Sequence, residues 1–248
     1  MLFSLTAWLF CLVPVHAETL KILTTGAFKQ VVLEFIPGFE ARTGVKVELQ
    51  NDTAGALIKR ISAGETFDVV FLTPGGLSTL ADQQKVDVAT IRPVAKVVIG
   101  VAVKSGAPHP KLETVEQFKE AVLGARKVAY IDPASGGSSG IYLDGLFRRL
   151  GIADEVRAKA ILVPGGLLAE RVANGEADLA IHQVSEILPV PGVSLAGLLP
   201  EPIQNATTYS SAVAASANNR PAATGFLAAM ASSGADAIIR AKGMQPVK

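Results

Sequence analysis

Short apolar runs alternate with amphipathic segments from the start of the chain. An apolar run at 20–23 predicts a strand, and apolar residues at every fourth position follow it, as on one face of a helix. These are Ala27, Val31, Phe35 and Phe39. Pro37 is expected to kink or end this helix near Ile36, and Gly44 to close the segment. Alternation at 45–49 predicts a second strand, which completes a β-α-β unit.

The same alternation continues through the next forty or so positions. A helix pattern containing Leu57, Ile58 and Ile61 stops at Gly64, and an apolar run at 67–72 predicts a buried strand. A third helix pattern follows through Leu77, Leu80 and Ala81. Three strands with alternating helices predict a doubly wound lobe, in which ligands bind beyond the carboxyl ends of the strands.

A second series of strands and helices begins with a long β-rich run at 96–104. Thr114 and Gln117 have the spacing of a capping box, which predicts a helix start. Further strands are predicted at 128–132, 160–163 and 178–182, and a helix at 141–150. The second half of the chain therefore repeats the architecture of the first.

The C-terminal part consists of a strand-like run at 207–215 and two helix patterns. These helices need a sheet to cover, so we place them on the first lobe, with crossings near 98–103 and 207–214. The predicted fold class is α/β, with two doubly wound lobes joined by two crossover hinge strands and a ligand cleft between them. Lobe 1 is expected to comprise residues 18–99 and 208–248, and lobe 2 residues 100–207.

Residues 1–17 differ from the rest of the chain. They carry no Lys, Arg, Asp or Glu, are apolar from Leu2 to Val13, and end in the small-x-small pattern Val15-His16-Ala17. We interpret them as a cleaved secretory signal peptide, with an uncleaved anchor as the alternative. The single cysteine, Cys11, would leave with this segment, so the mature chain is expected to have no thiol, which fits the bacterial periplasm.

The charge balance excludes two classes of partner. The chain has 23 basic and 22 acidic side chains, so neither a nucleic-acid surface nor a face for anionic lipid is expected. No histidine pair has metal-ligand spacing, so we expect no metal and no cofactor. Asp52 is interpreted as the N-cap of the helix after it, and Arg60 as part of a solvated helix face.

The loop at 132–142 offers the most distinctive chemistry. It is rich in Gly and Ser, follows a predicted strand and opens into a helix, which suits an anion bound by backbone N–H groups. It also matches the G-x-S-x-G pattern of a nucleophile elbow. In that interpretation Ser138 attacks, His182 is the base and Asp132 or Asp178 orients it. A third interpretation is that the glycines only form a tight turn.

Several stretches, spread over nearly the whole mature chain, resemble the extracellular solute-binding proteins of ABC importers. Among these the chain is most similar to the periplasmic molybdate-binding family. The stretches are 39–47, 61–70, Asp132-Pro133 with Ser139-Gly140-Ile141-Tyr142, 174–179 and 234–240. The resemblance implies that strand-end hydroxyls and backbone N–H groups of both lobes hold an oxyanion without a cationic side chain.

The resemblance places the candidate ligand-binding residues in five loops. They are Thr24, Thr25, Gly26, Asp52, Thr53, Ala54, Gly55, Ser138, Ser139, Gly140, Gly165, Gly166, His182 and Gln183. Two departures leave the ligand open between a molybdate- or tungstate-like oxyanion and an organic carboxylate. Asp52 lies where the family has a serine-rich loop, and Gln183 lies where it has a tyrosine. A carboxylate there disfavours a dianion unless it is turned away.

The sequence therefore predicts a periplasmic, monomeric binding protein that captures a small anion by hinge closure and passes it to the membrane permease of an ABC importer. We expect no chemistry on the ligand and no nucleic-acid partner. A periplasmic serine hydrolase is the alternative from a different class.

Overall fold

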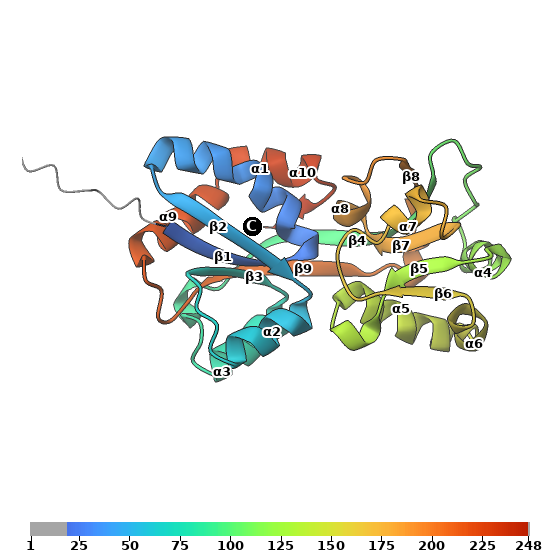
Figure 1. Cartoon of the computed structure of the whole chain (residues 1–248), viewed down its shortest axis with the longest axis horizontal. Helices are drawn as coiled ribbons and strands as arrows, with labels where there is room; N and C mark the ends of the chain where they lie inside the picture. Colours follow the sequence, from blue (N-terminus) through green and yellow to red (C-terminus); the bar gives the residue numbers. More distant parts are fainter. Residues whose placement is uncertain (1–18, 248) are drawn as a thin grey trace, which may run out of the picture.

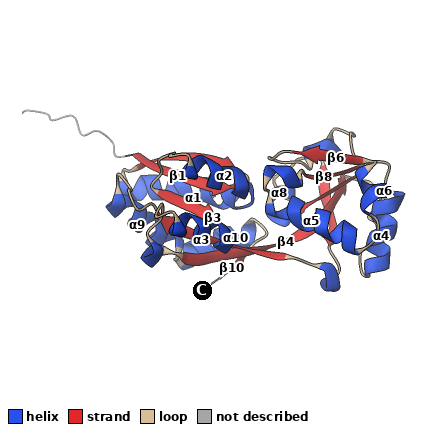
Figure 2. Cartoon of the chain, turned by 90° about the horizontal axis from the view of Figure 1, so that it is seen from below, coloured by secondary structure: helices blue, strands red, loops and turns tan. Residues whose placement is uncertain are grey.

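The computed structural model describes residues 19–247. The predicted signal peptide, with Cys11, lies outside the described residues. The described part of the chain forms two lobes that are joined by long strands running between them (Figures 1 and 2). Helices cover the strands in each lobe, so the predicted α/β fold class is confirmed.

The sheet of the first lobe mixes parallel and antiparallel pairing. Its strands, in spatial order, are β2 (Lys46–Asp52), β1 (Thr19–Thr25), β3 (Val69–Leu72), β9 (Ala206–Val213) and the first part of β4 (Arg92–Lys104). β1 pairs in parallel with β2 and β3, whereas β9 is antiparallel to β3 and β4. The short β10 (Gln245–Pro246) adds to β4. The carboxyl ends of β1, β2 and β3 therefore meet at one edge of the sheet.

Helices cover both faces of this sheet (Figure 1). One face carries α1 (Gly26–Thr43), α9 (Arg220–Met230) and α10 (Ser233–Ala241), and the other carries α2 (Ala54–Ser62) and α3 (Pro74–Asp82). Phe226 of α9 packs edge-on against Phe35 and Phe39 of α1, with ring centroids 5.3 and 4.9 Å apart. The C-terminal helices thus return to the first lobe, as predicted.

The sheet of the second lobe continues from β4. Its other strands are β7 (Leu179–Gln183), β5 (Val128–Ile131), β6 (Ala160–Val163) and β8 (Val193–Leu198). Its helices are α4 (Val115–Gly124), α5 (Ser138–Arg149), α6 (Ala153–Arg157), α7 (Glu170–Ala173) and α8 (Val184–Ile187). The 3-10 turns of the chain are η1 (Val88–Thr90), η2 (Pro133–Ser135) and η3 (Glu201–Ile203). The strand β8 and the helix α8 were not predicted from the sequence.

The crossing strand β4 changes partners in its middle. Its residues 92–98 pair with β9, and residues 99–104 pair with β7 and β8. This exchange near Val98 agrees with the predicted crossing. The residue boundaries predicted for the two lobes stay a prediction.

Pro37 does not end its helix, although a kink or an end near Ile36 was predicted. The helix α1 continues from Gly26 to Thr43 and ends at Gly44, whose φ of 72° and N–H bond to the Glu40 carbonyl form the C-cap. Pro37 and Leu33 both lie on the exposed face of α1. Proline has no N–H to bond the carbonyl four residues earlier, but water can solvate that carbonyl on an exposed face.

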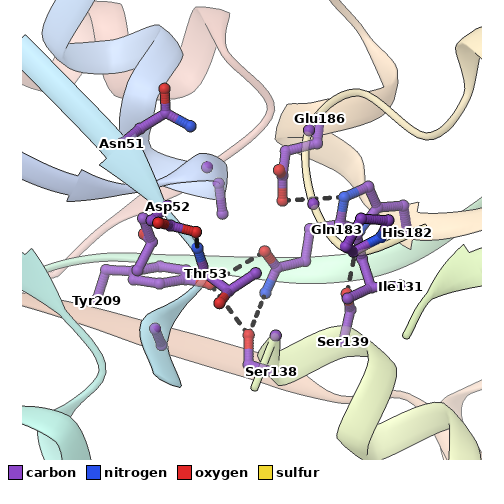
Figure 3. A pocket seen from close by; sticks show the side chains of 18 residues that line it. Asn51, Asp52, Thr53, Ile131, Ser138, Ser139, His182, Gln183, Glu186 and Tyr209 are labelled. Atoms are coloured by element: carbon purple, nitrogen blue, oxygen red, sulfur yellow. Dashed lines mark hydrogen bonds and ion pairs between the residues drawn. The ribbon is translucent and has the colours of Figure 1, made fainter. Parts of the chain in front are cut away.

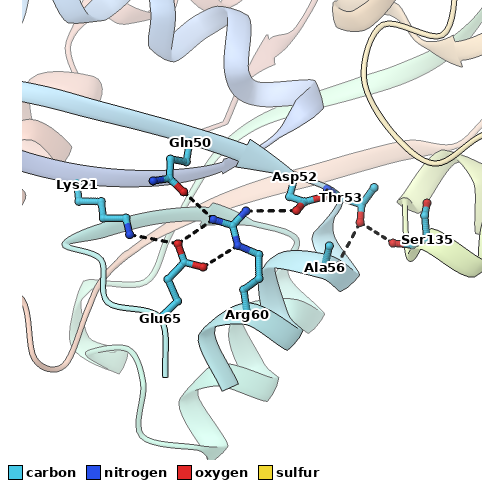
Figure 4. Close-up of polar contacts among 8 residues, drawn as sticks. All are labelled: Lys21, Gln50, Asp52, Thr53, Ala56, Arg60, Glu65 and Ser135. Carbon is cyan, nitrogen blue, oxygen red and sulfur yellow. Dashed lines mark hydrogen bonds and ion pairs between the residues drawn. The ribbon is translucent and has the colours of Figure 1, made fainter. Parts of the chain in front are cut away.

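Asp52 is not an N-cap, and Arg60 is not a freely solvated side chain. Thr53 caps α2 by accepting from the N–H of Ala56. Arg60 donates to both oxygens of Glu65 and lies 3.2 Å from an oxygen of Asp52 (Figure 4). The guanidinium is planar and offers several donors, so one arginine ties the end of β2 to the segment after α2.

The two lobes meet at the first turn of α2. The N–H of Gly55 donates to the carbonyl of Gly136 over 3.1 Å, and the Thr53 hydroxyl donates to the carbonyl of Ser135 over 2.5 Å. A Cβ on Gly55 would lie 2.9 Å from the Cα of Gly136, and one on Gly136 2.7 Å from the Cα of Gly55. We call this contact the glycine contact; it requires glycine on both lobes.

Within residues 19–247, no single helix is long and apolar enough to cross a membrane. The helices α9 and α10 meet the length and composition criteria together, but they are bent by 70° relative to one another.

Glu65→Gln is expected to lower the free energy of unfolding by about 1–2 kcal/mol at neutral pH. The hydrogen bond from Arg60 is the main reason that the pKa of Glu65 is lowered to about 2. A lowered native pKa means that the ionised form stabilises the fold, so this contribution is present above about pH 4.5 and is lost as the pH falls towards 2. The free energy of unfolding, measured with urea, should therefore differ less between the unchanged protein and Glu65→Gln as the pH falls from about 4.5 to 2. Glu120→Gln, at an exposed position, is the control. An equal loss of stability in that variant would show that the ion pair of Arg60 and Glu65 does not account for the effect.

Gly55→Ala is expected to hold the lobes apart, because the new methyl group would overlap the backbone at Gly136. Overpacking of this kind costs about 1–3 kcal/mol. It destabilises only the closed form, in which the two glycines touch. Small-angle X-ray scattering should therefore give a larger radius of gyration than for the unchanged protein.

Gly75→Ala is the matched control for that change. Gly75 holds the same second position of α3, also after a threonine N-cap, and nothing lies within 4 Å of a Cβ there. Equal radii for the two variants would show that the glycine contact does not control closure.

Candidate functional site

A cavity of about 290 Å³ lies between the lobes (Figure 3). This volume is near the lower end of the range of roughly 300–1,000 Å³ found for small-molecule sites. The lining residues come from strand ends and helix starts of both lobes. They are Thr25, Gly26, Ala27, Asn51, Asp52, Thr53, Ala54, Ile131, Gly137, Ser138, Ser139, Pro164, Gly165, Gly166, His182, Gln183, Glu186 and Tyr209.

Most of the residues predicted as ligand-binding line this cavity, but Thr24, Gly55 and Gly140 do not. The Thr24 hydroxyl is buried and bonds the carbonyl of Thr25. Gly55 belongs to the glycine contact. A Cβ on Gly140 would lie 2.3 Å from the carbonyl oxygen of Ile131, so this glycine allows α5 to approach β5. These three positions serve packing, and contact of the others with a ligand stays a prediction.

Three helices begin at the cavity wall. The sequence predicted that the helix after the Gly- and Ser-rich loop starts at Ile141, but α5 starts at Ser138, so Ser138, Ser139 and Gly140 form its first turn. The helices α1 and α2 begin at Gly26 and Ala54. Neither α1 nor α5 has a side-chain cap hydrogen bond. Their first N–H groups and the positive end of each helix dipole can therefore attract an anion.

The positive potential of the cavity does not come from basic side chains. Among the lining residues of the described chain there is no Lys or Arg. Asp52 faces the cavity edge, but its carboxylate accepts from the N–H of Thr53 and pairs with Arg60. The Asp52 carboxylate, which was predicted to disfavour a dianion, is thus turned towards Arg60. It does not cap α2, as had been predicted.

Ser138, Gln183 and Tyr209 form a polar ring on one side of the cavity (Figure 3). The Tyr209 hydroxyl donates to Gln183 Oε1 over 3.0 Å, and Gln183 Nε2 donates to Ser138 Oγ over 3.2 Å. The Ser138 and Tyr209 hydroxyls are 3.2 Å apart. Burial raises the pKa of Tyr209, so its hydroxyl stays protonated and can donate.

This ring removes the geometric basis for the predicted hydrolase. Ser138 faces Tyr209 and Gln183, and His182 instead contacts Ser139. Asp132 accepts from the N–H of Ala134, and Asp178 pairs with Arg126. The proposed nucleophile, base and orienting acid do not form a connected set.

Ser139, His182 and Glu186 form a line of buried side chains on the other side of the cavity (Figure 3). Ser139 Oγ lies 3.1 Å from His182 Nδ1, and His182 Nε2 lies 3.2 Å from Glu186 Oε2. Nε2 is buried and makes no aligned hydrogen bond with the rest of the described chain. An ionisable pair in this position can hold and transfer a proton.

The sequence reasoning missed Glu186 and Tyr209. Glu186 follows His182 by four residues, which brings it to the same side of the chain where β7 turns into the short helix α8. That spacing was the available signal, but α8 itself was not predicted. Tyr209 lies inside a crossing strand, and only the pairing of β9 with β3 and β4 brings it to the cavity.

Comparisons with known proteins show the family of the chain. Residues 20–245 match the model of the family described as "Bacterial extracellular solute-binding protein". A curated Pseudomonas protein named "Aconitate isomerase" is 33% identical over 235 residues, which cover 92% of this chain and 88% of the relative.

Solved structures agree with this fold. The periplasmic molybdate-binding protein of Azotobacter vinelandii superposes with a TM-score of 0.76 at 20% identity, over 92% of this chain and 100% of that one. The sulfate-binding protein of Mycobacterium tuberculosis gives 0.74 at 19% identity, over 93% and 88%. Similarity at this level of identity supports the fold alone.

The expectation that the protein performs no chemistry is wrong in the light of its curated relative, which carries the name of an enzyme. The stretches that carry the resemblance to binding proteins do not include Glu186. The match over residues 20–245 settles the family: the chain belongs to the bacterial extracellular solute-binding proteins.

Proposed function

We propose that the protein isomerises a small unsaturated polycarboxylate, aconitate or a close analogue, in the cavity between its lobes. The observation that carries this proposal is the buried pair of His182 and Glu186 in a cavity otherwise suited to anions. The curated relative named aconitate isomerase supports the same reaction.

The cavity offers separate places for several carboxylates. One lies at the start of α1 and one at the start of α5, and the loop at 164–166 forms another part of the cavity wall. The hydroxyls of Ser138 and Thr25 and the amide of Gln183 add polar contacts. A flat molecule with carboxylates at both ends and in the middle suits this distribution better than one tetrahedral anion does.

An oxyanion such as molybdate is the less suitable ligand for a second reason. Glu186 lies in the cavity and has no Lys or Arg among the other described lining residues to neutralise it. A second negative charge at short range disfavours a compact dianion. A polycarboxylate can instead direct a carbon-bound hydrogen towards Glu186 and its carboxylates towards the helix starts.

The chemistry of aconitate requires only proton movement. Its methylene hydrogen is acidic because a carboxylate and a double bond flank the carbon. Removing that proton leaves a negative charge shared by the two ends of a three-carbon unit, and both ends carry a carboxylate. Returning a proton to the other end shifts the double bond and regenerates aconitate, with cis or trans geometry set by the conformation in the cavity. A general base of suitable position contributes about 10²–10⁴-fold to such a step.

Three earlier predictions belong to this proposal. Export to the periplasm fits the extracellular family. Transfer of the bound solute to the permease of an ABC importer, and a monomeric state, stay predictions.

Incubation of the purified protein with cis-aconitate is expected to produce trans-aconitate, because the cavity combines anion binding with a buried acid-base pair. Proton NMR follows the reaction directly, since the vinyl hydrogens of the two isomers resonate at different positions. Heat-denatured protein and buffer alone are the controls. Unchanged cis-aconitate after prolonged incubation, with folded protein still present, would refute the proposed reaction.

Thermal unfolding is expected to distinguish the ligand classes. Aconitate isomers or the saturated analogue propane-1,2,3-tricarboxylate at 100 times Kd should raise Tm by roughly 5–10 °C, because a ligand of the native state alone stabilises it. Molybdate, tungstate, sulfate and phosphate at the same concentration should give smaller shifts. A larger shift with molybdate would restore the oxyanion prediction.

A further inference from the structure

We infer that Glu186 is the group that carries the proton, and that His182 and Ser139 position it. This inference rests on the proposed isomerase function and names the residues that perform its central step. It concerns three side chains that come from two segments, the start of α5 and the turn from β7 into α8.

Glu186 has the burial expected of a catalytic carboxylate. Its side chain is 7% exposed, yet it lines the cavity, so it can contact a bound molecule but little water. The other ionisable lining groups are committed elsewhere. Asp52 pairs with Arg60, and the Tyr209 hydroxyl is held by Gln183 with a raised pKa. Glu186 is therefore the carboxylate available for proton transfer in the described cavity.

The two oxygens of Glu186 have different surroundings. Oε2 lies 3.2 Å from His182 Nε2. Oε1 points across the cavity to Gly26 at the start of α1, where a Cβ would lie only 2.5 Å from it. The absence of a side chain at Gly26 thus makes room for Oε1 itself, which lies beside the start of α1. The arrangement assigns contact with the substrate to Oε1 and orientation of the carboxylate to Oε2.

Ser139 controls which ring nitrogen of His182 carries the proton. Its Oγ lies 3.1 Å from Nδ1, and a hydroxyl that donates to Nδ1 places the ring proton on Nε2. A proton on Nε2 then lies on the side of the ring that faces Glu186 Oε2, 3.2 Å away. In this tautomer the Nδ1 lone pair faces Ser139, so the ring directs no acceptor at the substrate.

Packing fixes Glu186 relative to the start of α1. Val184, two residues earlier, belongs to the hydrophobic core of the first lobe. A Cβ on Gly243, at the end of α10, would lie 2.8 Å from Val184 and 2.7 Å from Leu188, so α8 fits closely against that lobe. A substrate carboxylate bound at α1 would accordingly lie beside Oε1.

The proton transfer is balanced without any further reactant. Oε1 takes the proton from the methylene carbon, the C–H bond breaks, and its electron pair spreads over the three-carbon unit. The neutral carboxyl of Glu186 then returns a proton to the other terminal carbon, where a C–H bond forms and the double bond settles between the remaining two carbons. Glu186 ends as the carboxylate with which it began.

The test compares cis-aconitate isomerisation by the unchanged protein, Glu186→Gln and Ser139→Ala, with the thermal shift given by propane-1,2,3-tricarboxylate as a separate measure of binding. Glu186→Gln keeps the shape of the side chain and removes the base, so we expect kcat to fall by about 10²-fold or more. It should still fold and bind the tricarboxylate. Glu120→Gln, an exposed change on α4, is the control and should retain full activity.

Ser139→Ala is expected to lower kcat about tenfold with little change in KM, since it acts on the ring and not on binding. Nitrogen-15 NMR of the imidazoles gives the independent readout. His182 should carry its proton on Nε2 in the unchanged protein and lose that preference in Ser139→Ala. The His109→Gln variant assigns the signals, because His109 is the other histidine in the described chain.

The outcomes separate this inference from the function on which it rests. No turnover by the unchanged protein would refute the proposed isomerase and this assignment together. Turnover that persists in Glu186→Gln at more than a tenth of the normal kcat would refute the assignment of the base alone. A His182 tautomer that is unaffected by Ser139→Ala would refute the positioning role of Ser139.

Discussion

The close approach of Gly55 and Gly136 is the contact on which the closed cavity depends. It joins the first turn of α2 to the turn after β5, and the two Cα atoms can approach because neither residue carries a side chain. The same contact engages two donors that could otherwise bind a ligand, the Gly55 N–H and the Thr53 hydroxyl. The start of α2 therefore serves closure, while the starts of α1 and α5 remain open to an anion.

The source of positive potential determines which chemistry the cavity can support. A lysine or arginine beside Glu186 would pair with it and lower its basicity. Backbone N–H groups at the starts of α1 and α5 attract a carboxylate through partial charges that are fixed in place. The lining of this cavity in the described chain contains no Lys or Arg, so a carboxylate base and an anionic substrate can share it. A binding site built from oriented amides is in this sense already compatible with acid-base catalysis.

Local signals in the sequence were sufficient for the order of strands and helices and for the strand-end loops. Apolar runs and the Thr114–Gln117 capping box gave correct elements because they reflect interactions between residues near each other in the chain. A helix end at Pro37 and a solvated face at Arg60 were not found, because the surroundings of both residues come from elsewhere in the fold. Solvent on one face of α1 accommodates the proline, and Glu65 and Asp52 draw the arginine into a network. The start of α5 was placed three residues late because glycine and serine favour loops, although their small size is what lets α5 approach β5.

The side of the cavity that holds His182 and Glu186 was harder to predict for the same reason. His182 and Gln183 could be identified because they lie at a strand end. Glu186 could not, because it reaches the cavity only where α8 turns it back towards His182 and packs against the first lobe.

A hinged binding fold must satisfy one further condition to act as an isomerase, since its product has to leave. Tight binding of substrate and product alike would not accelerate the chemical step and would slow release. The lobes touch at the glycine contact, at Tyr209 with Ser138 and Gln183, and where α8 packs against the first lobe, and each hydrogen bond among these contributes only about 0.5–1.5 kcal/mol. Closure can then exclude water while Glu186 acts, and reverse when the isomer has formed. Contacts that are individually weak allow the lobes to reopen, which the release of product by an isomerase on this fold would require.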